Sequence, residues 1–443
     1  MATASRTGGG SSTGLPSGSF YAGFERRDGE LYCEDVALDR IAREAGTPSY
    51  VYSAGAVRDR YARLDAALGG KGTPHRIHYS LKANSNRAIL EVLHALGCGV
   101  DVVSGGELYR ALRAGFRGAD ILFGGVGKTP RELREALTAG VKLINVESEA
   151  ELRLLADIAL EMGVVAPVGL RINPEVDVAN AHRYISTGER GHKFGIGFSD
   201  ALHVGRVALG LRNIALHALD MHVGSQLSSF EAYKQGAARL VEASLELRRA
   251  GAPIRYLDAG GGLHVPYQSE AEPDLAAYGA ILKEAATALG EVELLVEPGR
   301  FFVAAAGTLV TRVLYRKETG GKTYLICDAG MTELLRPSHY DAYHLIEPVA
   351  APFGSMVADI VGPVCETGDF LALQREMPNV EAGALLAVRT AGAYGYVMSS
   401  HYNARPRVAE VMVDGARWAV VTAREEYVDL VRQESPSPLW RKH

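Results

Sequence analysis

From His75 onward, short apolar runs alternate with helical patterns, and this alternation limits the possible folds more than any other feature. Between the runs, apolar residues recur at the spacing of amphipathic helices. Eight separate strands over roughly 250 residues are typical of a (β/α)8 TIM-type barrel, although a doubly wound open sheet has the same local pattern. The strand count favours the barrel. The predicted strands are 76–81, 99–103, 120–123, 142–146, 168–172, 216–223, 254–257 and 293–296.

After about Arg300 the pattern changes, because strand-like runs follow one another closely and helical spacing returns only at 425–431. This texture predicts a second, all-β domain of Greek-key or β-sandwich type. A short strand near Leu31 is expected to pair with it. The predicted division is a disordered leader at 1–19, an N-terminal segment at 20–45, the barrel at 46–305 and the β domain at 306–443. The predicted late strands are 303–313, 322–327, 357–361, 385–389, 410–413 and 416–421.

Charge and composition exclude several classes of partner. The net charge of −5 leaves no basic stripe for nucleic acid or an anionic membrane, and no apolar run approaches the length of a membrane span. Residues 1–19 are rich in Gly, Ser and Thr, with Arg6 as their only basic residue, so a plastid transit peptide has weak support. Four cysteines without a secretory signal indicate reduced thiols and a cytoplasmic setting.

The stretch Tyr79–Asn86 holds the first candidate for chemistry. An apolar run precedes it and a helical pattern follows, so Lys82 is expected at the carboxyl end of a barrel strand, where such folds bind their ligands. A lysine there is costly to desolvate unless its charge or its amine is used. The alternative is a solvated loop lysine.

Three other strand ends carry candidate residues. The triplet Gly260–Gly262 could form a backbone nest for a phosphate group, or it could be an ordinary turn. Glu297 could be a surface carboxylate, or it could pair with a protonated ring nitrogen. His222 has no His or Cys neighbour in the sequence, which makes a metal site a poor hypothesis. It is either a core histidine or a planar ring that stacks on a cofactor.

Together these residues point to pyridoxal 5′-phosphate (PLP). The aldehyde of PLP needs a lysine amine to form its Schiff base, its phosphate needs backbone donors, and its pyridine nitrogen needs a carboxylate to stay protonated. Lys82, the glycine triplet and Glu297 supply one group for each need. The combination is much more specific than any one member.

Several motifs extend this reading to a family. The chain resembles the alanine-racemase-type barrel group of PLP enzymes, and within it the diaminopimelate decarboxylases, over about residues 29–433. The motifs that carry the resemblance are 79–84 (YSLKAN), 184–188 (YISTG), 193–196 (KFGI), 222–226 (HVGSQ), 260–262 (GGG), 297–300 (EPGR), 336–340 (RPSHY), 362–366 (GPVCE), 392–396 (GAYGY) and 398–406 (MSSHYNARP).

The resemblance implies a role for each site residue. Lys82 would carry the cofactor, His222 would stack on its ring, and Glu297 would pair with the ring nitrogen. Cys365, reaching in from the partner subunit of a homodimer, would return a proton to the carbon that loses carbon dioxide. Alternatively, Cys365 is a buried, unreactive thiol without a catalytic role. The residues implied to hold the cofactor phosphate are Ser225, Gly260, Gly261, Gly262, Gly299, Arg300 and Tyr394.

The implied reaction is decarboxylation of meso-2,6-diaminopimelate to L-lysine, the last step of lysine biosynthesis. Its distal carboxylate needs arginines and its distal ammonium needs an acid. The resemblance assigns the ammonium to Glu366. The residues assigned to the distal end of the substrate are Arg300, Arg336, Tyr340, Tyr394 and Glu366.

Two departures and three alternatives stay open. His264 stands where the family usually has Gly, and His401 stands where it usually has Asn. Because relatives in specialised pathways keep these motifs, the substrate could instead be ornithine, lysine or a modified amino acid. An amino-acid racemase on the same barrel is a second alternative. A non-catalytic PLP carrier is a third, although carriers lack a β domain.

Overall fold

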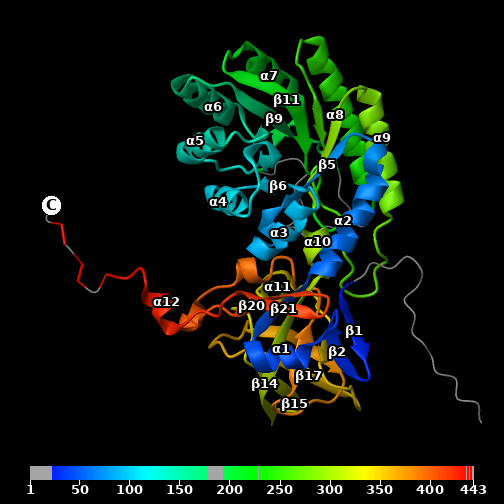
Figure 1. The fold of residues 1–443 in the computed structure, drawn as a ribbon, viewed down its shortest axis with the longest axis vertical. Coiled ribbons are helices and arrows are strands. Elements are labelled where there is room, and N and C mark those ends of the chain that lie inside the picture. Colours follow the sequence, from blue (N-terminus) through cyan, green and yellow to red (C-terminus); the bar gives the residue numbers. More distant parts are fainter. Residues whose placement is uncertain (1–21, 177–192, 228, 436, 439, 442–443) are drawn as a thin grey trace, which may run out of the picture.

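The structure is a computed structural model, and it describes residues 22–176, 193–227, 229–435, 437–438 and 440–441. The predicted leader at 1–19 and the motif Tyr184–Gly188 lie outside these residues. Figure 1 shows the described chain as two parts, a ring of strands and helices and, beside it, a region of strands that contains α11 and β14.

The first part is a closed barrel, which confirms the predicted fold class. All pairings around the ring are parallel, and it closes because β8 pairs with β9 as well as with β7. These strands are almost wholly buried, because in a parallel barrel both faces of the sheet are covered. The barrel strands are β5 (His75–Ser80), β6 (Gly99–Val102), β7 (Ile121–Phe123), β8 (Leu143–Val146), β9 (Ala166–Asn173), β11 (Ile214–Met221), β12 (Tyr256–Asp258) and β13 (Glu293–Val296).

Helices connect successive barrel strands and cover the outside of the ring (Figure 1). Local sequence signals set many of their ends. Thr129 and Glu132 form a capping box at the start of α5, and Ser104 and Ser148 cap α4 and α6. The helices are α2 (Ala54–Leu68), α3 (Arg87–Ala95), α4 (Gly105–Arg113), α5 (Pro130–Ala139), α6 (Glu149–Met162), α7 (Phe198–Gly210), α8 (Glu231–Arg249) and α9 (Leu275–Leu289).

The second part is an all-β sheet, as predicted. Its main path runs in the order β18-β17-β15-β14-β4-β20-β21, and β16 and β19 pair beside β14. The strands are β4 (Ser49–Ser53), β14 (Gly307–Thr319), β15 (Lys322–Cys327), β16 (Ile346–Pro348), β17 (Met356–Val361), β18 (Phe370–Met377), β19 (Leu385–Val388), β20 (Ala409–Asp414) and β21 (Arg417–Thr422).

Three details differ from the sequence prediction. Residues 49–53, which fell within the predicted barrel segment, form β4 and lie between β14 and β20 in the second sheet. The predicted strand at 303–313 begins only at Gly307, because α10 (Arg300–Val303) comes first. Strand β18 was not predicted, since the polar run Gln374–Glu376 breaks its apolar pattern.

The N-terminal segment packs on the second sheet. It consists of β1 (Phe24–Arg27), β2 (Glu30–Cys33), β3 (Val36–Ala37) and α1 (Leu38–Ala45). The backbone N–H of Leu31 donates to the carbonyl of Val349, and Leu31, Leu38 and Ile41 share an apolar cluster with residues of the sheet. No helix in the described ranges is long and apolar enough to cross a membrane.

Hydrogen bonds join the second part to the mouth of the barrel. The N–H of Tyr394 donates to the carbonyl of Ala83, and the Asn84 side chain donates to the carbonyl of Gly392. Asn86 reaches the buried carboxyl of Glu410 on β20, 2.8 Å away. These contacts fix the β sheet against the loop that carries Lys82, so one wall of any site at this mouth must come from the second part.

Candidate active site

A cavity of about 540 Å³ opens where the barrel strands end and the second part begins. Barrel strand ends supply most of its lining, and α11 (Arg336–Tyr340) and the loop at Tyr394 supply the rest. The predicted site residues on its wall are Lys82, His222, Ser225, Gly262, Glu297, Gly299, Arg300, Arg336, Tyr340 and Tyr394. Sequence reasoning therefore brought together ten residues that lie far apart in the chain.

Lys82 follows β5 in a short 3-10 turn (Leu81–Ala83), and its side chain is 40% exposed to this cavity. Its Nζ lies 3.8 Å from the carboxylate of Asp101 at the end of β6. Burial opposes protonation, but Asp101, Tyr394 and Glu297 outweigh it and raise the pKa of the lysine. The amine is thus held as an ammonium ion until a partner in the site takes its proton.

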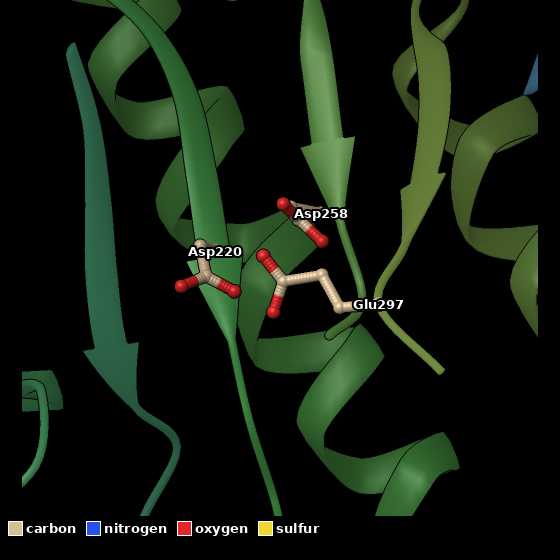
Figure 2. A group of neighbouring side chains, drawn as sticks. All are labelled: Asp220, Asp258 and Glu297. Atoms are coloured by element: carbon tan, nitrogen blue, oxygen red, sulfur yellow. The ribbon is translucent and has the colours of Figure 1, made fainter. Parts of the chain in front are cut away.

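Glu297 ends β13 and belongs to a cluster of three buried carboxyl groups (Figure 2). The other two are Asp220 on β11 and Asp258 on β12, and oxygen atoms of all three lie within 4.8 Å of one another. Of the three, only Glu297 lines the cavity. Asp258 accepts the N–H of Gly260, whereas one oxygen of Asp220 and one of Asp258 are buried without a hydrogen-bond partner.

Such a cluster cannot be fully ionised without a cation. Burial first, and then the neighbouring carboxylates, raise the pKa of Asp258 to about 7 and raise the pKa of Glu297 and Asp220 well above the ordinary range. The spacing of the oxygens would also suit a metal ion. Lys82 and Arg171 already place positive charge beside the cluster, so a metal ion is less necessary to balance the carboxylates.

His222 directly follows β11 and meets the glycine loop. Its Nδ1 accepts the N–H of Gly261 at 3.2 Å. Burial, together with Lys82 and Arg171, lowers the pKa of the imidazole well below its ordinary value, so the ring is neutral. Of the triplet, Gly262 lines the cavity, while Gly260 and Gly261 pack so closely that a Cβ would lie 2.2–2.3 Å from neighbouring carbonyl oxygens.

Two arginines form the opposite wall. Arg300 donates to the Tyr267 hydroxyl at 3.0 Å and to Ser225 Oγ at 3.2 Å, and its guanidinium lies over the ring of Tyr394. Arg336 donates from Nε to His344 at 3.4 Å. Both arginines are buried, yet both reach the cavity. An anionic group would therefore be held by charge-assisted hydrogen bonds in a site that excludes water.

Cys365 and Glu366 lie elsewhere. Both are exposed, and neither lines the cavity of the described chain. The N–H of Cys365 donates to the Asn403 side chain, and Asp369 holds the loop by accepting the N–H groups of Met331 and Val364 at 2.6 Å each. Within one chain the thiol is thus presented to solvent on an ordered loop.

Sequence reasoning missed several residues that support the site. Asp101 and Asp258 lie at the ends of β6 and β12, but no role was predicted for them from the sequence. Tyr267 and His344 lie on loops, where periodicity carries no signal. The strand residue Arg171, whose side chain lines the cavity and contacts Glu147 at 2.9 Å, had no signal beyond its place in a predicted strand.

The described residues fit PLP. A lysine amine and a neutral histidine ring face one cavity, and an arginine stands ready for a phosphate or carboxylate. Asp220 and Asp258, which pack beside Glu297, each have one buried oxygen without a hydrogen-bond partner. A cationic ring nitrogen would balance the negative charge of this acidic cluster. A neutral sugar or an apolar ligand would add no positive charge to that of Lys82 and Arg171.

Comparison with known proteins agrees with this fit. Residues 54–304 match the family described as pyridoxal-dependent decarboxylase, pyridoxal binding domain. A diaminopimelate decarboxylase of Vibrio cholerae is 46% identical over 414 residues, which is 93% of this chain and 98% of that protein.

Solved structures extend the match to the whole fold. The crystal structure of diaminopimelate decarboxylase from Helicobacter pylori complexed with L-lysine is 36% identical, has a TM-score of 0.86 and covers 90% of this chain and 99% of its own. The crystal structure of diaminopimelate decarboxylase from m. jannaschii in co-complex with L-lysine is 34% identical, has a TM-score of 0.88 and covers 94% of this chain and 98% of its own.

Proposed function

The chain belongs to the diaminopimelate decarboxylases, a family of PLP-dependent decarboxylases, and we propose that the cavity at the barrel mouth is its active site. The reaction is the conversion of meso-2,6-diaminopimelate to L-lysine and carbon dioxide, the last step of lysine biosynthesis. The observation that carries the site assignment is that Lys82, Glu297 and Arg336 face one cavity although they lie far apart in the sequence.

Bound PLP supplies an electron-withdrawing ring that stabilises the negative charge left on carbon when carbon dioxide departs. Lys82 would hold the cofactor through its amine, and Asp101, 3.8 Å from Lys82 Nζ, would keep that amine in place. Glu297 would keep the ring nitrogen protonated. The positive charge on that nitrogen would favour the ionised form of Glu297, although burial and the neighbouring carboxylates raise its pKa. His222 would lie against the ring without adding charge, because its imidazole is neutral.

The distal end of the substrate is recognised by the opposite wall. Arg336 and Arg300, with Tyr340, bind the distal carboxylate. This arrangement favours diaminopimelate as the substrate, because ornithine or lysine that reacts at its α-carbon has no carboxylate at the distal end. Ser225, Gly262 and the neighbourhood of Arg300 hold the cofactor phosphate, with Tyr394 at the edge of both subsites. Glu366 pairs with the distal ammonium.

Cys365 protonates the carbon after carbon dioxide leaves, and it acts from a second copy of the chain. Its exposure, and its absence from the cavity of its own chain, support a homodimer in which each site uses residues of both subunits. The free state of all four cysteines supports a reducing, cytoplasmic setting.

Carbon dioxide release by the purified, PLP-loaded protein tests the proposal. We expect release from meso-diaminopimelate, with L-lysine as product, and none from L,L-diaminopimelate, ornithine, lysine or arginine. Release from another of these amino acids would keep Lys82 and Glu297 in their roles and would refute those of Arg336 and Glu366. No release from any of them, with the cofactor spectrum intact, would refute the decarboxylase assignment and direct attention to racemisation.

A further inference from the structure

Tyr267 stands behind the cavity wall between its two arginines. Its hydroxyl accepts a hydrogen bond from Arg300 at 3.0 Å, and the guanidinium of Arg336 lies over its ring, 4.9 Å from the centroid. Tyr267 is not itself among the residues that line the cavity. One side chain therefore contacts both cations through two different groups, the hydroxyl and the π face.

A side chain that contacts both arginines is needed to hold them in place, because their two positive charges repel each other. Burial is the largest cause that lowers the pKa of Arg336, and Arg300 lowers it further, whereas Tyr267 raises the pKa of both guanidinium groups. The pKa of Tyr267 shows the reciprocal effect: burial raises it, but Arg300 and Arg336 outweigh burial and lower it. Without the tyrosine, each arginine would gain freedom to turn away from the other.

The loop that carries Tyr267 is fastened at several points. The ring nitrogens of His264 lie 3.0 Å from the carbonyl of Leu227 and 2.9 Å from that of Ala271. Gln226 exchanges two hydrogen bonds with the backbone of Val265, and Glu270 accepts the N–H of Tyr267. The ring is thus placed by its own loop, so it can position the arginines rather than follow them.

A second support fixes the orientation of Arg336. His344 is buried, and its Nδ1 lies 2.9 Å from the carbonyl of Arg389, which makes Nδ1 the donor and leaves Nε2 to accept from Arg336 Nε. Burial and the neighbouring arginines lower the pKa of His344 to about 3, so it stays neutral at working pH. With Nε committed to His344, the planar end of the guanidinium is left for a ligand carboxylate.

We propose that Tyr267 is a positioning residue for substrate specificity, which spaces Arg300 and Arg336 so that both can bind the carboxylate at the distal end of the substrate. The proposal rests on the proposed function, since it assumes a substrate with that second carboxylate. It concerns how tightly that end is held and leaves the reaction at the cofactor unchanged.

The test compares two ligands that differ at the distal end. In Tyr267→Phe, which keeps the ring and loses the acceptor for Arg300, we expect KM for meso-diaminopimelate to rise about tenfold, with kcat changed less than about threefold. Tyr267→Leu, which also removes the ring below Arg336, should raise KM further. The inhibition constant of cadaverine, the diamine that corresponds to the substrate without either carboxyl group, should stay within about twofold in both variants.

Tyr61→Phe is the matched control, because Tyr61 is a half-buried tyrosine that packs on Phe302 away from the cavity, and both constants should stay at parental values. Parallel rises in KM and in the cadaverine constant would overturn the proposal, since they would mean that Tyr267 only supports the fold of the site. An unchanged KM in Tyr267→Leu would also overturn it. Failure of the parent enzyme to decarboxylate meso-diaminopimelate would instead refute the proposed function.

Discussion

The cofactor side of the cavity and the loop of Cys365 differ in how much of their surroundings one chain supplies. Lys82, His222 and Glu297 project from barrel strand ends and are enclosed by neighbouring strands of the same chain. Cys365 is ordered by Asn403 and Asp369, yet it is exposed and does not line that cavity. In the described residues, the first region lies on the cavity wall of one chain, whereas the second presents an ordered thiol that lies outside that cavity.

This difference indicates a division of labour. A group that binds a cofactor must be preorganised within a rigid scaffold, because small displacements cost large factors in rate. A group that delivers one proton can be supplied from outside, provided that its loop is fixed. Replacements at Lys82, Cys365 and Asp258 test this contrast, in order of decreasing expected effect.

Replacing Lys82 with Ala should give the largest effect. Turnover should be abolished, and so should the absorbance of lysine-bound cofactor, because no other amine in the described part of the cavity wall can bond the aldehyde. Stopped assays of L-lysine formation and an absorbance spectrum of the PLP-loaded protein measure both. Lys283→Ala, on the outer helix α9, is the control and should behave as the parent. Retained turnover in Lys82→Ala would remove the basis of the site assignment.

Replacing Cys365 with Ala should lower kcat by about 10²–10⁴-fold and leave the cofactor spectrum unchanged, since the loss concerns proton delivery alone. Mixing its subunits with those of Lys82→Ala then tests where the thiol acts. If sites are shared, random pairing makes about half of the dimers mixed, and each mixed dimer has one intact site, so activity should recover to about 25% of the parent.

No recovery in subunits shown to have exchanged would mean that Cys365 serves its own chain, and the contrast between the two regions would fail. The exchange itself can be followed with two affinity tags on the two variants. Each variant alone provides the baseline, because neither Lys82→Ala nor Cys365→Ala dimers contain an intact site.

How far the sequence predicts the site follows the same division. Lys82 and Glu297 were found because each ends a barrel strand, and parallel strands bring their ends to one mouth. Asp220 was missed because it lies within a strand, where a single acid looks like an outward residue until the closure of the barrel is known. Tyr267 was missed because the path of its loop depends on tertiary contacts such as those of His264. Cys365 is proposed to act across a contact between two subunits, and a single chain contains no such contact from which its neighbours could be predicted.

The smallest effect should come from Asp258, behind Glu297. Its folded-state pKa of about 7 exceeds the ordinary value of 3.8, so the folded, cofactor-free protein keeps a proton that the unfolded chain releases. The free energy of unfolding should therefore fall as pH rises from about 4 to 7, by at most about 1.4 kcal/mol per pH unit from this group. Asp258→Asn carries no such proton, so its stability should fall less steeply than that of the parent.

Urea unfolding of cofactor-free protein at pH 5, 6, 7 and 8 measures this slope. Asp414→Asn is the control, because Arg58 and Arg417 lower the pKa of Asp414 to about 2 and it stays ionised throughout this range. Its curve should run parallel to that of the parent, whereas the curve of Asp258→Asn should converge on or cross the parental one as pH rises. Parallel curves for Asp258→Asn would mean that the acidic cluster does not hold its proton at Asp258. The negative charge opposite the cofactor ring would then be shared among the three carboxyl groups rather than concentrated on Glu297. The role of partner to the ring nitrogen would belong to the cluster and not to Glu297 alone.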